Sequence, residues 1–204
     1  MYIDINKCDI NNDYFHFTNK ENINGIIRNG LLLSKGSATE MKNHEANVSI
    51  SKGAKGILGI LNSFIFVFSE LKCNEVPEDF RKYFDGVNFN SNSTVGLENA
   101  CTAISNKLKD EVYFKVDLDE EQLERAHVGG FGAAYDIRLS EDVDKSKVHL
   151  VTDSNLNILS AYDVASYIYD KTESKDIYRN MNSEFYYMMD RNNGSDRKYE
   201  PFTF

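Results

Sequence analysis

Short stretches of alternating hydrophobic and polar residues indicate β-strands in this chain. Residues 13–18 (DYFHFT) are rich in aromatics, and residues 111–118 (EVYFKVDL) alternate cleanly. Both patterns are typical of strands, because successive side chains point to opposite faces of a sheet. Residues 48–53 (VSISKG) predict a further short strand, and residues 127–140 and 142–153 each predict one at their C-terminal ends.

A helical pattern follows the first of these strands directly. Ile23, Ile26 and Ile27 form an apolar stripe at helical spacing. Thr18 is the predicted N-cap of this helix, because Glu21 stands three residues later as in a capping box. Gly30 stands where a C-cap is expected. The segment therefore predicts a strand, a helix and an abrupt stop.

Longer amphipathic or apolar segments complete the pattern. They predict helices over residues 53–72, 96–110, 158–172 and 176–194, and the acidic residues 119–126 predict a short helical turn. Residues 73–96 are polar and predict a surface loop. The chain shows neither an internal repeat nor a linker rich in Gly, Ser or Pro. We therefore expect an α+β fold in a single domain over residues 1–204.

Composition and charge argue against several classes of protein. The 204 residues are 41% hydrophobic, enough for a packed core, and the net charge of −9 gives no general footprint for nucleic acid. The N-terminus lacks a signal-peptide pattern. The longest apolar stretch is about a dozen residues and is interrupted by Asn62 and Ser63, so we expect no membrane span. We expect a cytoplasmic protein, or one delivered into a target cell without an N-terminal signal.

Cysteine and histidine spacing predicts no metal site. Three cysteines stand far apart in the sequence, which favours free thiols over a zinc site or a disulfide framework. His44, His127 and His149 lack metal-ligand spacing with any cysteine or histidine.

His16 is the residue of most chemical interest. On a strand, Tyr14, His16 and Thr18 share one face, and Phe15 and Phe17 share the other. If the two phenylalanines face the core, His16 and Thr18 point towards a cleft or solvent. A polar side chain held on a rigid strand is well placed to grip a ligand. The alternative is a packed, hydrogen-bonded core histidine.

The stretch His16-Phe17-Thr18, followed by ENINGIIRNGL, resembles the strand–helix opening of the ADP-ribosyltransferase-like superfamily. That superfamily includes DNA-modifying toxins, poly(ADP-ribose) polymerases, rifamycin ADP-ribosyltransferases and RNA 2'-phosphotransferases. The resemblance covers about 20 residues. It implies an α+β domain of two small packed antiparallel sheets with flanking helices, and NAD as the substrate.

The resemblance also implies roles for individual residues. His16 would contact a ribose hydroxyl of NAD, and Thr18 would support it. The main chain just after the histidine, at Phe17, would pair with the nicotinamide amide. Ser49 or Ser51, on the second strand, would lie beside the nicotinamide.

A carboxylate on a later strand completes the implied site. Relatives most often have a glutamate there, whereas this chain offers Asp136, with Arg138 two residues on and on the same face. The carboxylate would stabilise the positive charge that develops as nicotinamide leaves. An exposed Asp136–Arg138 ion pair without function is the alternative, and Glu184 is a reserve carboxylate.

The glycine-rich loop with Gly129, Gly130 and Gly132 would order over NAD or face the target, unless it is a plain connection.

These implications predict a mono-ADP-ribosyltransferase-like protein that transfers ADP-ribose from NAD to a protein or nucleic acid. A toxin or effector is the implied setting, with an antitoxin or a host protein as partner. Two alternatives stay open. One is a catalytically inactive ADP-ribosyltransferase-fold binding module. The other is an RNA 2'-phosphotransferase-like enzyme, in which Arg28 and Arg138 would hold phosphates.

Overall fold

The computed structural model describes residues 1–34, 46–128 and 136–171, and at residues 127, 128 and 136 it describes the main chain alone. The chain forms two compact units. The sheet unit comprises the described residues of 1–60 and 108–171, and the helical unit comprises residues 61–107. The expected α+β class is confirmed, whereas the single domain over residues 1–204 stays a prediction.

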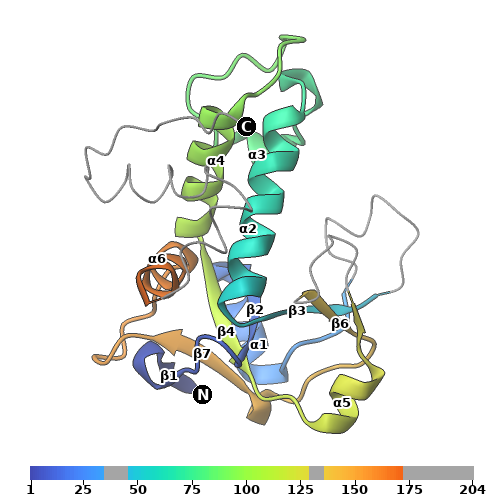
Figure 1. The fold of residues 1–204 in the computed structure, drawn as a ribbon, viewed down its shortest axis with the longest axis vertical. Helices are drawn as coiled ribbons and strands as arrows, with labels where there is room; N and C mark the ends of the chain where they lie inside the picture. The colour runs from blue at the N-terminus through green and yellow to red at the C-terminus, as the bar shows by residue number, and fades with distance from the viewer. Residues whose placement is uncertain (35–45, 129–135, 172–204) are drawn as a thin grey trace, which may run out of the picture. The chain divides into compact units, whose positions relative to one another are not determined.

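All described strands belong to one mixed sheet of the sheet unit, in the order β1-β7-β4-β2-β3-β6-β5 (Figure 1). The strands are β1 (Tyr2–Asp4), β2 (Tyr14–Asn19), β3 (Val48–Lys52), β4 (Glu111–Val116), β5 (His127–Val128), β6 (Asp136–Leu139) and β7 (Val148–Thr152). The β1–β7 pair is parallel and the other pairs are antiparallel. The expectation of two small packed sheets is therefore wrong for the described part of the chain, because the strands pair edge to edge into a single sheet.

The register of β2 differs on its two sides. Against β4 it pairs over its whole length, from Tyr14↔Val116 to Asn19↔Glu111. Against β3 it pairs only at Tyr14↔Lys52 and Phe15↔Ser51. The β2–β3 ladder therefore ends at Phe15, although β2 continues for four more residues.

The main hydrophobic cluster of the sheet unit lies on the face that carries His16. Cross-strand partners lie on the same face of a sheet, and His16 is the partner of Phe114, a member of the cluster. The buried members are Ile26, Leu31, Val48, Ile50, Val112, Phe114, Val116, Leu139, Val143, Val148 and Leu150. The opposite face is buried too, since Phe15 is fully buried and packs edge-on against Tyr113. The simple assignment of one core face and one open face is therefore wrong.

The described α-helices are α1 (Ile23–Asn29), α2 (Gly53–Glu70), α3 (Glu78–Arg81), α4 (Leu97–Lys109), α5 (Glu120–Arg125) and α6 (Ala161–Lys171). All but α3 were expected from the sequence, α5 as a short acidic turn. The short α3 lies inside the segment 73–96 that was expected to be a loop. The helix expected over residues 176–194, with Glu184, lies outside the described residues.

The start of α1 corrects the expected cap. The chain first makes a 3₁₀ turn over Lys20–Asn22, and the side chain of Asn19, not of Thr18, accepts the hydrogen bond from the Glu21 amide. The expected stop at Gly30 is confirmed, since its N–H donates to the Ile26 carbonyl at 2.8 Å. Gly30 has a φ of +84°, and a Cβ there would collide with the Val143 carbonyl oxygen.

Helix α2 starts against the N-terminal loop of the sheet unit. The N–H groups of Gly53 and Ala54 donate to the carbonyls of Asp13 and Ile10, at 2.8 and 2.6 Å. These bonds satisfy two amides that a helix N-terminus leaves unpaired.

Of the described helices, only α2 is long and apolar enough to cross a membrane, and more than half of it is buried in the fold. The core helices of soluble proteins can match α2 in length and apolar composition. The properties of α2 therefore do not test the expectation that the protein has no membrane partner, which stays a prediction.

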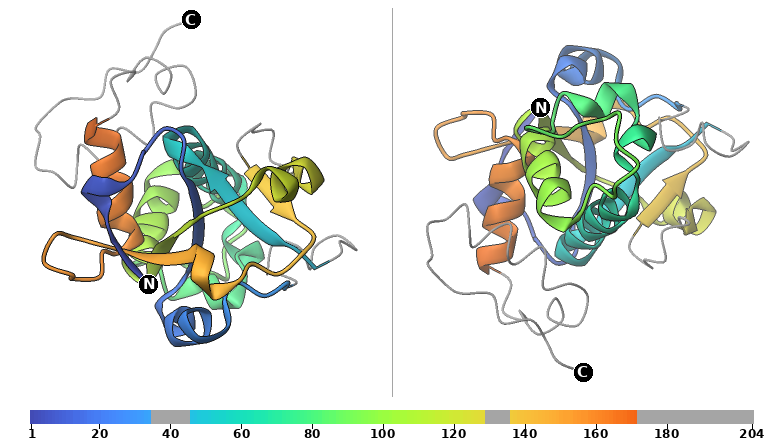
Figure 2. Two further views of the ribbon diagram at one scale, coloured as in Figure 1. Left: turned by 90° about the horizontal axis from the view of Figure 1, so that it is seen from below. Right: turned by 90° about the horizontal axis from the view of Figure 1, so that it is seen from above.

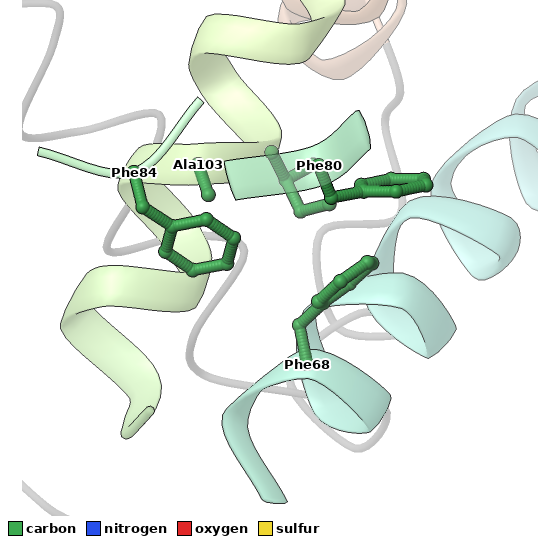
Figure 3. Close-up of a pocket in the computed structure, with 5 residues that line it drawn as sticks. Phe68, Phe80, Phe84 and Ala103 are labelled. Carbon is green, nitrogen blue, oxygen red and sulfur yellow. The ribbon is translucent and has the colours of Figure 1, made fainter. Parts of the chain in front are cut away.

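Two further views show α6 beside the N-terminal segment (Figure 2). The Tyr167 hydroxyl of α6 donates to Asn6 Oδ1 at 3.1 Å. In the helical unit, Phe68, Phe80, Phe84, Ala103 and Ile104 surround an apolar hollow (Figure 3). The hollow does not admit even one water molecule, so it is packing rather than a ligand site.

Candidate functional site

His16 is held at the point where β2 and β3 stop pairing. Its Nδ1 lies 2.9 Å from the main-chain oxygen of Ser49. A carbonyl oxygen only accepts, so Nδ1 carries the proton. Burial lowers the pKa of the half-buried imidazole, and the hydrogen bond to Ser49 opposes that shift only in part. The ring is therefore neutral at pH 7, with Nε2 as a hydrogen-bond acceptor.

The main chain of Phe17 points towards the side where the strands diverge. The Gly53 N–H donates to the Asp13 carbonyl, so the amide group of Asp13 faces β3. Amide groups of alternate residues in a strand face the same side, which places those of Phe15 and Phe17 towards β3 as well. If the β2–β3 ladder continued in the same register, Ser49 would pair with Phe17. The ladder ends at Phe15, two residues before that point.

The other predicted residues lie on neighbouring strands. Ser51 is paired with Phe15 on one side and with Asp136 on the other, which makes one row across β2, β3 and β6. The next row joins Ser49 and Arg138. The order β2-β3-β6 thus brings together three segments that are far apart in sequence.

The serine side chains do not face His16. Ile50 lies between them in sequence and belongs to the core cluster on the face of His16, so Ser49 and Ser51 point to the opposite face. Ser51 is buried, and the exposed Ser49 donates through its hydroxyl to Asn47 Oδ1 at 3.1 Å. His16 contacts the main chain of Ser49 rather than a hydroxyl.

Thr18 shares a face with His16 but does not touch it through a described hydrogen bond. Its Oγ1 accepts from Asn22 Nδ2 at 2.9 Å. Arg138 is half-buried on β6 and, like its partner Ser49, lies on the face opposite His16, because its neighbours Ile137 and Leu139 pack against the core cluster. Arg28 is exposed in the last turn of α1.

Three of the predicted site features lie partly or wholly outside the described residues. For Asp136 only the main chain is described, so the role of its carboxylate and its pairing with Arg138 stay predictions. The glycine loop at 129, 130 and 132 and the reserve carboxylate Glu184 lie outside the described residues.

A charged network on the opposite face was not anticipated. Asp117 accepts from Lys115 Nζ at 2.6 Å and from His149 Nε2 at 2.8 Å, and Lys115 also lies 3.6 Å from Asp13. Partial burial raises the pKa of Asp117, but the hydrogen bonds from Lys115 and His149 outweigh it and hold that pKa below its usual value. Strict alternation in residues 111–118 already placed Lys115 and Asp117 on one face. The third residue of the network, His149, joins them only because the β4–β7 register pairs it with Lys115.

Neither nucleophilic nor metal chemistry is favoured at this network. Burial, and next the charge of Asp13, raise the pKa of the nearby Cys8 thiol to about 11, which keeps it protonated and poorly nucleophilic. Within residues 1–34, 46–128 and 136–171, no group of three or more histidines, cysteines and carboxylates could hold a metal ion.

Comparison with models of known protein families gives no match, and comparisons with curated proteins and with solved structures give none either. We therefore infer the function from the residues and geometry around His16.

Proposed function

We propose that this protein is an ADP-ribosyltransferase-like enzyme that binds NAD and transfers ADP-ribose to a macromolecular acceptor. The observation that carries the proposal is the neutral imidazole of His16, fixed through Nδ1 by the Ser49 carbonyl where β2 and β3 diverge. The resemblance of residues 16–31 to the superfamily supports it. So does the adjacency of β2, β3 and β6, which carry all the residues assigned to the site.

Each residue has a defined task in this proposal. Nε2 of His16 accepts a hydrogen bond from a ribose hydroxyl, with Thr18 in support. The main chain of Phe17 pairs with the nicotinamide amide. The main chain of Ser49 orients His16, and β3 with Ser49 and Ser51 borders the nicotinamide.

The proposed reaction breaks the bond between nicotinamide and ribose. The Asp136 carboxylate stabilises the positive charge that develops on the ribose. The acceptor is a protein or a nucleic acid. By family analogy, the protein is a toxin or effector that acts in the cytoplasm of its own or of a target cell, with an antitoxin or a host protein as partner.

The test follows nicotinamide release from NAD by the purified full chain. We expect release by the wild type and a rise in melting temperature at millimolar NAD. Asp136→Asn removes the anion and lowers the release rate by roughly 10²-fold or more. Asp79→Asn, an exposed carboxylate on α3, serves as the matched control and keeps the wild-type rate.

Different failures have different meanings. Neither nicotinamide release nor an NAD-dependent thermal shift would remove the proposal. A thermal shift without release would instead favour the inactive binding module. Removal of the 2'-phosphate from a phosphorylated RNA would favour the RNA 2'-phosphotransferase alternative.

A further inference from the structure

Lys52 and Tyr14 form a cation–π pair on the face of the sheet that carries His16. The two residues are cross-strand partners in the β2–β3 ladder, and the Lys52 ammonium lies 5.7 Å from the centre of the Tyr14 ring. Both side chains are half-buried. Tyr14 also packs against the core cluster, so the ring is held on a rigid element.

The Tyr14 ring orients the Lys52 ammonium but does not neutralise its positive charge. Among the residues that the structure describes, the contact with Tyr14 is the single interaction of its side chain. A carboxylate partner would cancel the charge, whereas an aromatic ring orients the ammonium and leaves its charge for another anion. The sequence contains 32 acidic residues, so a half-buried cation without a described acidic partner is notable.

The spacing between Tyr14, which holds Lys52, and His16 suits a ribose and its phosphate. His16 and Tyr14 point to the same face two residues apart on β2, which is about 7 Å along a strand. That separation is comparable to the span from a ribose hydroxyl to the phosphate on the same sugar. A lysine serves as a point-charge partner for phosphate and needs no bidentate geometry.

We propose that Lys52, oriented by Tyr14, binds the phosphate attached to the ribose that His16 contacts. This inference rests on the proposed function and adds to it a residue that recognises the charged part of NAD. Residues from two strands then bind one nucleotide, since β2 supplies the ribose contact and β3 supplies the phosphate contact.

The test uses a ligand series that adds phosphate in steps: nicotinamide riboside, nicotinamide mononucleotide and NAD. Calorimetry measures the affinity of each for the wild type, for Lys52→Met and for Lys52→Arg. Lys7→Met is the matched control, because Lys7 is exposed and lies in the 3₁₀ turn after β1. Tyr14→Phe keeps the ring that orients Lys52 and removes only its hydroxyl.

We expect Lys52→Met to weaken nicotinamide mononucleotide and NAD by about 10- to 100-fold, the range for loss of a hydrogen bond to a charged group. Its affinity for the riboside stays within about twofold of the wild type, which also shows that the variant is folded. Lys52→Arg, Lys7→Met and Tyr14→Phe keep most of the affinity for NAD. The loss in Lys52→Met shrinks at high salt.

Two results would overturn the inference while leaving the proposed function intact. In one, Lys52→Met binds the mononucleotide as tightly as the wild type does. In the other, the variant loses affinity for the riboside and the mononucleotide equally, which would make Lys52 a structural residue. If the wild type binds none of the three ligands, the proposed function itself fails.

Discussion

His16 is both packed against the core and fixed by a hydrogen bond. Its ring is half-buried beside the apolar cluster of Phe114, yet Nδ1 is used in a hydrogen bond to a carbonyl of the next strand. The bond fixes the tautomer and the ring orientation without a carboxylate partner among the described residues. A fixed, neutral imidazole acts as an acceptor through Nε2, and protonation would convert that acceptor into a donor.

The lowered pKa of His16 predicts a specific pH dependence of stability. As the pH falls below about 6.5, an unfolded histidine gains a proton while the folded one stays neutral. The unfolded state then binds more protons, so the free energy of unfolding falls with decreasing pH until the folded pKa is reached.

We expect His16→Gln to remove this contribution, whose slope is at most about 1.4 kcal/mol per pH unit for one proton. Urea unfolding of the wild type and the variant between pH 7 and about pH 5 measures the difference. Parallel curves for the two proteins would contradict the lowered pKa.

At the scale of elements, the start of α2 links the strand of Lys52 to the N-terminal loop. Gly53 has a φ of +57° and lies so close to Asn11 that a Cβ would collide with the carbonyl of that residue. The loop is held in turn by Lys115, whose ammonium lies between Asp13 and Asp117. The position of β3 relative to β2 thus depends on one glycine and one partly buried charge network.

Gly53→Ala should destabilise the protein, because alanine disfavours a left-handed conformation by about 1–2 kcal/mol, and the collision with Asn11 adds to that cost. The matched control is Gly25→Ala in α1, where a Cβ meets nothing within 4 Å. There, alanine should stabilise the helix by up to about 1 kcal/mol. Thermal unfolding separates the two variants, and an unchanged melting temperature for Gly53→Ala would refute the close approach.

At the scale of the whole molecule, each unit has its own buried side chains. In the sheet unit, both faces of the central strands are covered, with Phe114 on one face and Phe15 on the other. In the helical unit, Phe68 packs against both Phe80 and Phe84, with the Phe68 and Phe80 ring centres 4.8 Å apart. The proposed nucleotide site lies where the β2–β3 ladder ends.

Phe114→Ala should cost about 3–5 kcal/mol of stability, because it leaves a cavity at a position with no exposed surface. Phe66→Ala removes the same ring from a position that is 57% exposed and should change stability by about 0.5 kcal/mol or less. Chemical denaturation compares the two. Equal losses would mean that Phe66 is covered by a partner or another segment.

Much of the local structure followed from the sequence, and the errors have physical causes. The alternation in residues 14–18 and the isoleucine spacing in α1 predicted both elements, and Gly30 predicted the stop. Thr18 was wrong as the cap because the 3₁₀ turn lets Asn19 reach the free amide first. The pairing of His149 with Asp117 depends on the register between β4 and β7, which no local pattern encodes.

The sequence by itself determined most of the helices and strands, though not β1, β5 or α3. It also determined which side chains share a face, because periodicity and end signals act over a few residues. Only the tertiary structure decided that β2, β3 and β6 are neighbours and that β2 and β3 part after Phe15. It also decided that His16 meets the main chain of Ser49 and that Lys52 lies over Tyr14. Strand order and register result from the packing of the whole sheet, so they cannot be read from any one segment.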